Sequence, residues 1–238
     1  MTESSSSSHQ QILAEFLASA GYDSLPDEVI ARARWVVADS LAVIGAAMRE
    51  PEVRSLVALL AEEEGAGSAT VIGSKARLAR SMAAYVNGTA GTFLELDEGN
   101  QFARGHPGIH VVPASLARGG AAGGGGRDRL LAVALGYGVG SRIGIASKIR
   151  MSMHPHGTWG TVGAAVSAGK LSGLDAQGFR DLINISSCLG LTTSRRTMLE
   201  GGTVRNSYSG ISNELGLRAE QMLRAGLPGE AEGLRTGY

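Results

Sequence analysis

The sequence is poor in several residue types that mark particular classes of protein. Its 238 residues include one cysteine, Cys188, which permits no disulfide within the chain. Lysine plus arginine equals aspartate plus glutamate at 22 each, so the basic excess typical of nucleic-acid-binding proteins is missing. Only 4 Phe and 2 Trp occur, and runs of aromatic and β-branched residues typical of strands are few. These features exclude a disulfide-rich fold and predict no nucleic-acid partner.

Long apolar runs and leader-like segments are also missing from the sequence. The longest apolar candidate, residues 35–48, contains Asp39 and is too short to span a bilayer, so we expect no membrane partner. The first residues, MTESSSSSHQQ, lack the basic region and apolar core of a signal peptide, which predicts a cytoplasmic protein. The serine-rich residues 1–8 are predicted to form a disordered tail, and residues 9–238 a single domain.

Glycine is abundant, with 35 residues, and apolar positions follow helical spacing along most of the chain. The predicted helices span residues 10–20, 27–48, 52–64, 76–95, 130–149, 158–171, 176–191 and 211–223, with one short strand over 69–73. Another helix is expected to start at Pro113, and GGAAGGGG at 119–126 to form a flexible turn. Because small side chains let helices approach closely, the sequence predicts a compact all-α fold with small-residue helix packing.

Four of the five histidines lie in two tight clusters, HPGIH starting at His106 and HPH starting at His154. Proline disfavours helix at the preceding residue, so each cluster is predicted to occupy a loop before a small-residue helix, which excludes a helical HExxH zinc pair. Rigid loops at helix N-termini commonly hold catalytic groups and suit anionic ligands. His106 and His154 are therefore the candidate catalytic pair. His110 and His156, which do not precede a proline-fixed position, are expected to be structural or peripheral.

The acids Glu95, Asp97 and Glu98 stand shortly before the first histidine cluster. Close carboxylates can raise one another's pKa and so provide a general acid or base, although a solvated helix end would show the same residues. A metal site built from Asp97, Glu98, His106 and His154 is chemically possible, because imidazole and carboxylate suit zinc, iron or manganese. Its spacing matches no ligand signature, so no metal is predicted.

The remaining polar candidates have simpler interpretations. Arg195 and Arg196 are expected on the surface, whereas Arg205 is expected to contact an anion. Cys188 lies in an apolar helical run without a cationic neighbour in sequence, which predicts a buried, inert thiol. The glycine run at 119–126 is not followed by GKS or GKT, so it does not predict a phosphate-binding loop.

Five blocks of the chain carry a resemblance to a known family. They are LPDEVIARARWVVADSLAVIGAA, AAYVNGTAGTFLELDEGNQFARGHPGIHVVPASLA, LLAVALGYGVGSRI, MHPHGTWGTVGAAVSAGKLSGL and GGTVRNSYSGISNELGLRAEQMLRAGLPG. On these blocks the chain resembles the MmgE/PrpD family of dehydratases, decarboxylases and epimerases. The resemblance implies the helical domain of that family without its smaller α/β lid domain, and a homodimer. A lid supplied by a separate polypeptide is a further partner that it leaves open.

The resemblance also implies a set of catalytic residues. Family chemistry is metal- and cofactor-independent removal of a proton next to a carboxylate, followed by loss of water or carbon dioxide or by reprotonation. Glu95 falls at the family's acidic position, where aspartate is usual, and His106 and His154 match its two histidines. With pKa values near neutrality, the two imidazoles are expected to exchange the proton of the substrate.

Substrate binding is expected from Asp97, Glu98, Arg104, Thr158 and Arg205. Arg205 stands where the family has lysine, which keeps the charge and the forked carboxylate contact but removes a group able to donate a proton at neutral pH. The predicted function is a lyase of dehydratase or decarboxylase type acting on a small carboxylate, without a cofactor. The alternatives are an epimerase or isomerase of the same family, a non-catalytic or partner-dependent helical domain, and a metal enzyme.

Overall fold

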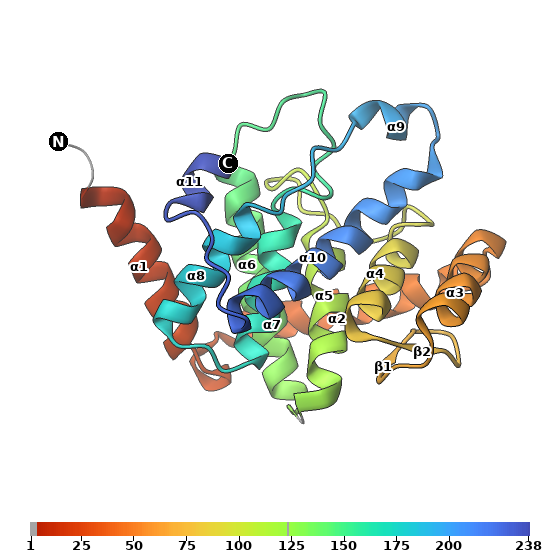
Figure 1. Cartoon of the computed structure of the whole chain (residues 1–238), viewed down its shortest axis with the longest axis horizontal. Helices are drawn as coiled ribbons and strands as arrows, with labels where there is room; N and C mark the ends of the chain where they lie inside the picture. Colours follow the sequence, from red (N-terminus) through yellow and green to blue (C-terminus); the bar gives the residue numbers. More distant parts are fainter. Residues whose placement is uncertain (1–3, 123) are drawn as a thin grey trace.

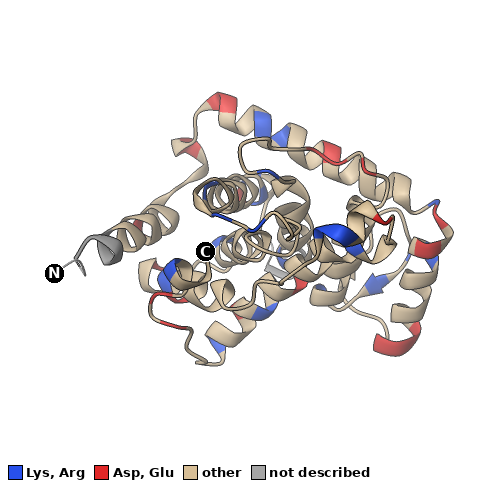
Figure 2. Ribbon diagram, turned by 90° about the horizontal axis from the view of Figure 1, so that it is seen from above, with Lys and Arg blue, Asp and Glu red and all other residues tan. Residues whose placement is uncertain are grey.

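The computed structural model describes residues 4–122 and 124–238 and shows a mainly helical chain (Figure 1), which confirms the predicted all-α class. The longer helices are α1 (Ser4–Ser19), α2 (Asp27–Ala47), α3 (Pro51–Glu64), α4 (Arg80–Gly91), α5 (Pro107–Ala122), α6 (Gly126–Ala146), α7 (Gly160–Leu171), α8 (Ala176–Ser187) and α10 (Ser207–Arg224). The shorter elements are the 3-10 helices η1 (Tyr22–Ser24) and η2 (Thr203–Asn206), the helices α9 (Arg195–Leu199) and α11 (Gly233–Gly237), and the strands β1 (Ala69–Thr70) and β2 (Arg77–Leu78). Figure 2 shows acidic and basic residues on many of the helices rather than on one face alone.

The helix α7 is central and contacts α5, α6, α8 and α10 (Figure 1). Every residue from Gly160 to Gly169 is buried, and none of these side chains is larger than valine. Neighbouring helices therefore approach closely: a Cβ added at Gly136 of α6 would lie 2.5 Å from the carbonyl oxygen of Gly163. The predicted small-residue packing is confirmed at this crossing.

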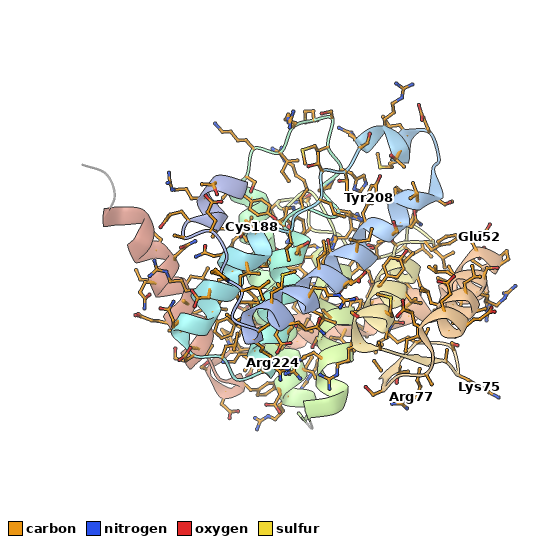
Figure 3. The ribbon with its side chains drawn as sticks, in the orientation of Figure 1. Glu52, Lys75, Arg77, Cys188, Tyr208 and Arg224 are labelled. Atoms are coloured by element: carbon orange, nitrogen blue, oxygen red, sulfur yellow. The ribbon has the colours of Figure 1, made fainter. Side chains whose placement is uncertain are left out.

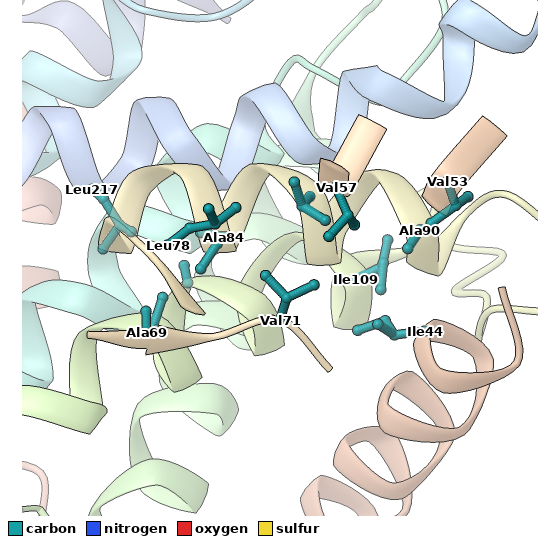
Figure 4. Packing of buried hydrophobic residues seen from close by; sticks show 14 of the residues in the cluster. Ile44, Val53, Val57, Ala69, Val71, Leu78, Ala84, Ala90, Ile109 and Leu217 are labelled. Atoms are coloured by element: carbon teal, nitrogen blue, oxygen red, sulfur yellow. The ribbon is translucent and has the colours of Figure 1, made fainter. Parts of the chain in front are cut away.

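A two-stranded hairpin covers one edge of the largest apolar core. Strand β1 pairs with β2 in antiparallel register, with Ala69 opposite Leu78. Val71 and Leu78 are fully buried and pack with side chains of α4 and α10 (Figure 4). The sequence pattern predicted one strand and a helix from residue 76, which is wrong at this point because residues 77–78 pair with β1 before α4 begins.

The start of α5 differs from the prediction. This helix begins at Pro107 rather than Pro113, because proline at the first helical position has a suitable φ and needs no hydrogen bond from its nitrogen. His110 therefore lies on α5 and not in a loop. The helix continues to Ala122 and so includes the first half of the predicted glycine turn, while α6 begins at its last residue, Gly126; Gly123 lies outside the described residues.

Two further expectations concern the ends of elements. The helix α1 begins at Ser4 and so includes part of the predicted tail, while residues 1–3 lie outside the described residues. The division into tail and domain at residue 9 stays a prediction. The expected burial of Cys188 is wrong, because the residue follows the last turn of α8 and is exposed beside α11 (Figure 3).

Candidate active site

Three connections, which precede α5, α7 and α10, enclose a pocket of about 410 Å³. The lining residues are Glu95, Arg104, Gly105, His106, Ile149, Arg150, Met151, Met153, His154, Pro155, His156, Arg195, Met198 and Arg205. Within the described part of the chain, this lining combines four arginines and three histidines with one acid. The excess of positive charge favours an anionic ligand.

The second histidine cluster is held against the connection that precedes α10. Met153 and Ser194 form an isolated antiparallel bridge. The hydroxyl of Thr193 donates to the carbonyl oxygens of His154 at 2.7 Å and of His156 at 2.9 Å. Because Thr193 is itself buried, these bonds fix the HPH segment in one conformation.

The structure brings the two histidine clusters together. The ring centroid of His156 lies 5.0 Å from that of His106 and 4.6 Å from that of His154. His110, on α5, contacts the same ring, with 5.0 Å between the centroids. The two rings that precede the prolines therefore share a neighbour and face one pocket, as acid-base chemistry requires.

His106 is oriented by Asp97, through a hydrogen bond to its backbone carbonyl oxygen and an ion-pair contact with its carboxylate. Its Nδ1 lies 3.0 Å from Oδ2 of Asp97 and 3.2 Å from the carbonyl oxygen of Asp97. Both partners are acceptors, so we assign the proton of the neutral ring to Nδ1 and a free lone pair to Nε2. The hydrogen bond to the Asp97 carboxylate raises the pKa of His106 above its ordinary value of 6.5.

His154 is affected in the opposite direction. The backbone N–H of His156 donates to its Nδ1 at 3.1 Å, so the neutral ring carries its proton on Nε2. Burial, with smaller contributions from the charges of His106 and Arg195, lowers the pKa of His154 to about 4. The expectation that both pKa values lie near neutrality is therefore not met, because only His106 has a carboxylate partner.

Glu95 and Arg205 form an ion pair at the edge of the pocket, between an exposed carboxylate and a buried guanidinium. Glu95 has a backbone φ of 58° and Arg104 a φ of 54°, and both values lie in the left-handed region that non-glycine residues seldom adopt. Such backbone conformations gather at functional sites, where the surrounding structure imposes them.

Three of the predicted binding residues do not line this pocket. Asp97 lies behind His106 and supports its ring. Glu98 lines a neighbouring pocket with Tyr137, accepts from the N–H of Gly108 at 3.3 Å, and has its pKa raised by burial. The Thr158 hydroxyl donates to the Pro155 carbonyl oxygen at 2.5 Å. Direct substrate contacts from these residues stay predictions.

Two residues that the sequence analysis did not place in the site also line the pocket. Arg195 is exposed, as expected, and also lines the pocket, because the bridge between Met153 and Ser194 brings its backbone beside the histidine segment. His156, expected to be structural or peripheral, borders the pocket with 2% exposure and stands between the other rings. No local sequence signal identifies Arg195 as a pocket residue. The histidine pattern includes His156, but the sequence analysis gave it a structural or peripheral role and chose His106 and His154 as the pair.

Two wider expectations can be compared with the geometry of the described residues. Among the described residues, no group of three or more His, Cys, Asp or Glu side chains is arranged to hold a metal ion. None of the described helices combines the length and apolarity required to cross a membrane.

Fold and pocket together define a helical domain whose pocket, among the described residues, is bordered by three imidazoles and four arginines. The chain matches the model of the MmgE/PrpD N-terminal domain over residues 11–236, and it belongs to the MmgE/PrpD family. It is 27% identical over 206 residues to cis-aconitate decarboxylase of Aspergillus terreus, covering 82% of this chain and 41% of that protein. The same protein from A. terreus strain NIH 2624 / FGSC A1156 matches to the same extent. The chain thus spans about two-fifths of the length of these curated relatives.

Proposed function

We propose that this chain forms the proton-transfer side of the active site of a lyase, of decarboxylase or dehydratase type, acting on a small di- or tricarboxylate. The observation that carries the proposal is the convergence of His106 and His154 on one pocket with their pKa values moved in opposite directions. Titratable groups separated in this way take the acid and base roles of a site. The similarity to a cis-aconitate decarboxylase supports a carboxylate substrate.

In this proposal His106 is the base. Asp97 holds Nδ1–H through its carbonyl oxygen and its nearby carboxylate, which leaves the lone pair of Nε2 for the proton next to the substrate carboxylate. His154 stays neutral above a pKa of about 4 and presents Nε2–H as a hydrogen-bond donor. A neutral donor of this kind stabilises charge that develops on a substrate oxygen.

The arginines are proposed to hold the carboxylates of the substrate. Arg104, Arg150, Arg195 and Arg205 border the pocket, and a guanidinium can bind a carboxylate through two parallel hydrogen bonds. Glu95, which is already paired with Arg205, is proposed to exchange this contact with the incoming substrate carboxylate. Such clamps reduce the entropic part of the barrier by fixing the reacting carbon beside the imidazoles.

The two reaction types use the same base differently. In a dehydration, His106 takes the proton from carbon, the electron pair forms the double bond, and the hydroxyl leaves as water with that proton. In a decarboxylation, the carbon–carbon bond breaks, carbon dioxide leaves, and the carbon takes a proton from protonated His106. Neither step, as proposed, draws on a metal or a cofactor.

Deuterium exchange tests the proposal. The chain is incubated in D₂O with cis-aconitate and with citrate, and loss of the carbon-bound proton signals is followed by ¹H NMR. We expect exchange that disappears in His106→Gln and slows about 10²-fold in His154→Ala, the usual effect of removing one donor. His9→Ala, on an exposed residue, is the matched control. Exchange at the wild-type rate in His106→Gln would contradict the proposal, and binding without exchange or turnover would favour a non-catalytic role.

The pH dependence separates the two reaction types. Proton removal requires neutral His106, so its rate should rise with pH through the raised pKa of that residue, above 6.5, and then level off. Proton donation after decarboxylation requires the protonated ring, so its rate should fall through the same pKa. A rate that is flat from pH 5.5 to 9 would exclude His106 from both roles.

A further inference from the structure

The ring of His156 lies at the centre of the histidine group and contacts three other rings. Its centroid lies 4.6 Å from that of His154 and 5.0 Å from those of His106 and His110. The ring planes cross at 82°, 82° and 88°, so each contact is edge to face. Aromatic rings favour this arrangement at such separations. The side chain therefore acts on its neighbours through packing.

Within the described residues, no polar contact explains a histidine at this position. The His156 residue is 2% exposed, and neither of its ring nitrogens has a hydrogen-bond partner there. A buried polar atom without a partner costs free energy and calls for an explanation in the function of the site. Among the described residues, His156 forms its hydrogen bonds through its backbone, which donates to Nδ1 of His154 and accepts from Thr193. The ring is thus fixed by its own main chain and inserted between its neighbours.

We propose that His156 is a positioning residue, whose ring keeps the rings of His106 and His154 apart and fixes the direction in which each faces the pocket. Without this ring, water would enter beside His154 and that imidazole could turn away from its backbone donor. The role deepens the proposed function and rests on it for its chemical purpose. The spacing itself can be measured without a substrate.

Other charged and aromatic groups act on the same two rings and remain when His156 is changed. The proposed base faces the carboxylates of Asp97 and Glu98. The proposed donor faces Arg195 and, at 6.0 Å between ring centroids, Tyr208 at the start of α10 (Figure 3). Because these groups belong to other connections and to α10, a change at His156 leaves their charges in place. A shift in either titration then reports on the inserted ring.

The experiment compares His156→Ala, which removes the ring, with His156→Phe, which keeps a ring and removes both nitrogens. Protein with ¹⁵N-labelled histidine is titrated from pH 3.5 to 9, and ring ¹H–¹⁵N spectra report the pKa and tautomer of each histidine. His9→Ala, outside the cluster, is the control for assignment and for loss of a histidine as such. Circular dichroism and the emission of the buried Trp159 confirm folding.

In the wild type we expect His154 to show the Nε2–H tautomer. In His156→Ala its pKa should rise by at least about one unit, because water relieves the burial that lowers it, and the tautomer should become mixed. In His156→Phe both properties should stay near the wild type. A folded Ala variant with an unchanged His154 titration would overturn the proposal. A His156→Phe variant in which the pKa of His154 rises and its tautomer becomes mixed would also overturn the proposal. This measurement on His156→Phe decides the matter if His156→Ala does not fold.

Turnover separates this proposal from the proposed function. If a carboxylate is turned over, kcat/KM should fall on the order of 10²-fold in His156→Ala, mainly through kcat, and recover in His156→Phe. Titrations that respond as expected in a chain without turnover would support the positioning role and contradict the proposed function. Turnover together with an unchanged His154 titration in His156→Ala would support the proposed function and contradict the positioning role.

Discussion

Glu95 and Arg104 connect the energetics of single residues to the pocket that they border. Both adopt a left-handed backbone, with φ values of 58° and 54°. Such a conformation costs a non-glycine residue roughly 1–2 kcal/mol, because its Cβ approaches the following carbonyl oxygen. Glycine would relieve this cost but would carry no charge. The surrounding structure keeps both charged side chains at the pocket despite this cost, as is typical of functional sites.

A pair of substitutions at Arg104 tests this trade between stability and binding. Arg104→Gly and Arg104→Ala both remove the guanidinium, so we expect both to weaken binding of cis-aconitate by about 10-fold to 100-fold, measured by titration calorimetry. Only the glycine variant relieves the backbone, so it should be more stable than the alanine variant by roughly 1 kcal/mol in urea unfolding. Equal stability of the two variants would show that the backbone at this position is not strained.

The sequence identified His106 and His154 as site residues and missed Arg195, and each outcome has its own physical reason. Proline after His106 and after His154 limits the backbone on either side, so a local pattern identified both residues as fixed points. Arg195 carries no such local mark. It lines the pocket because of the bridge between Met153 and Ser194, which joins residues 41 positions apart, and pairing at this range leaves no trace in a local pattern.

At the level of helices, Pro113 interrupts the hydrogen bonding of α5, and Asn213 of α10 takes the place of the missing donor. Lacking an N–H, Pro113 cannot donate to the carbonyl oxygen of Ile109. Nδ2 of Asn213 donates to that oxygen at 2.8 Å, and its Oδ1 accepts from the N–H of Ala114 at 2.9 Å. Because Asn213 is fully buried, these bonds join the two helices where water cannot replace them.

A double-mutant cycle measures this contact. Asn213→Ala removes the side-chain acceptor of the Ala114 N–H and leaves the carbonyl oxygen of Ile109 buried without the donor that replaces Pro113, so the free energy of unfolding should fall by about 2–4 kcal/mol in urea. Pro113→Ala supplies the missing N–H, and in the Asn213→Ala background it should recover roughly 1 kcal/mol. The same change in the wild-type background should give less, since Ile109 already has a donor. Equal effects of Pro113→Ala in both backgrounds would contradict this account.

The crossing of α4 and α10 depends on a glycine for steric reasons. A Cβ added at Gly210 would lie 2.3 Å from the carbonyl oxygen of Tyr85, which cannot move without displacing α4. We expect Gly210→Ala to lower the free energy of unfolding by about 2–3 kcal/mol, as overpacking does. The matched control is Gly45→Ala in α2, where an added Cβ meets no atom within 4 Å, and which should be neutral or stabilising by up to about 1 kcal/mol. Similar losses in both variants would show that helix propensity, not the crossing, decides the result.

Elements were predictable where burial follows a simple period. The predicted helix over 27–48 differs from α2 by one residue at its end, because its apolar spacing and its acidic first turn both mark a helix. The early start of α5 could not be read with the same rule, since a proline can begin a helix as well as end one. The strand β2 has two residues and exists through its pairing with β1, so no period within it could reveal it.

For the molecule as a whole, the histidine group couples stability to pH. Burial lowers the pKa of His110 to about 3 and of His154 to about 4, and it lowers the pKa of His156 well below 6.5. In the unfolded chain these rings titrate near 6.5. Between pH 6.5 and about 4 the unfolded state therefore binds more protons than the folded state, and stability must fall as the pH falls through this window.

The free energy of unfolding should accordingly decrease as the pH is lowered from 6.5 to 4.5. Each depressed histidine contributes up to about 1.4 kcal/mol per pH unit, while Glu98 and Glu214, whose pKa values are raised by burial, act in the opposite direction. We expect a net slope on the order of 2 kcal/mol per pH unit, measured by urea unfolding in buffers of constant ionic strength. His9→Ala should keep this slope, because His9 is exposed. His110→Leu should reduce the slope by up to about 1.4 kcal/mol per pH unit, which is the contribution of one proton. A pH-independent stability in the wild type would mean that the rings are solvated in the folded chain, and the packed histidine group on which the site depends would then be wrong.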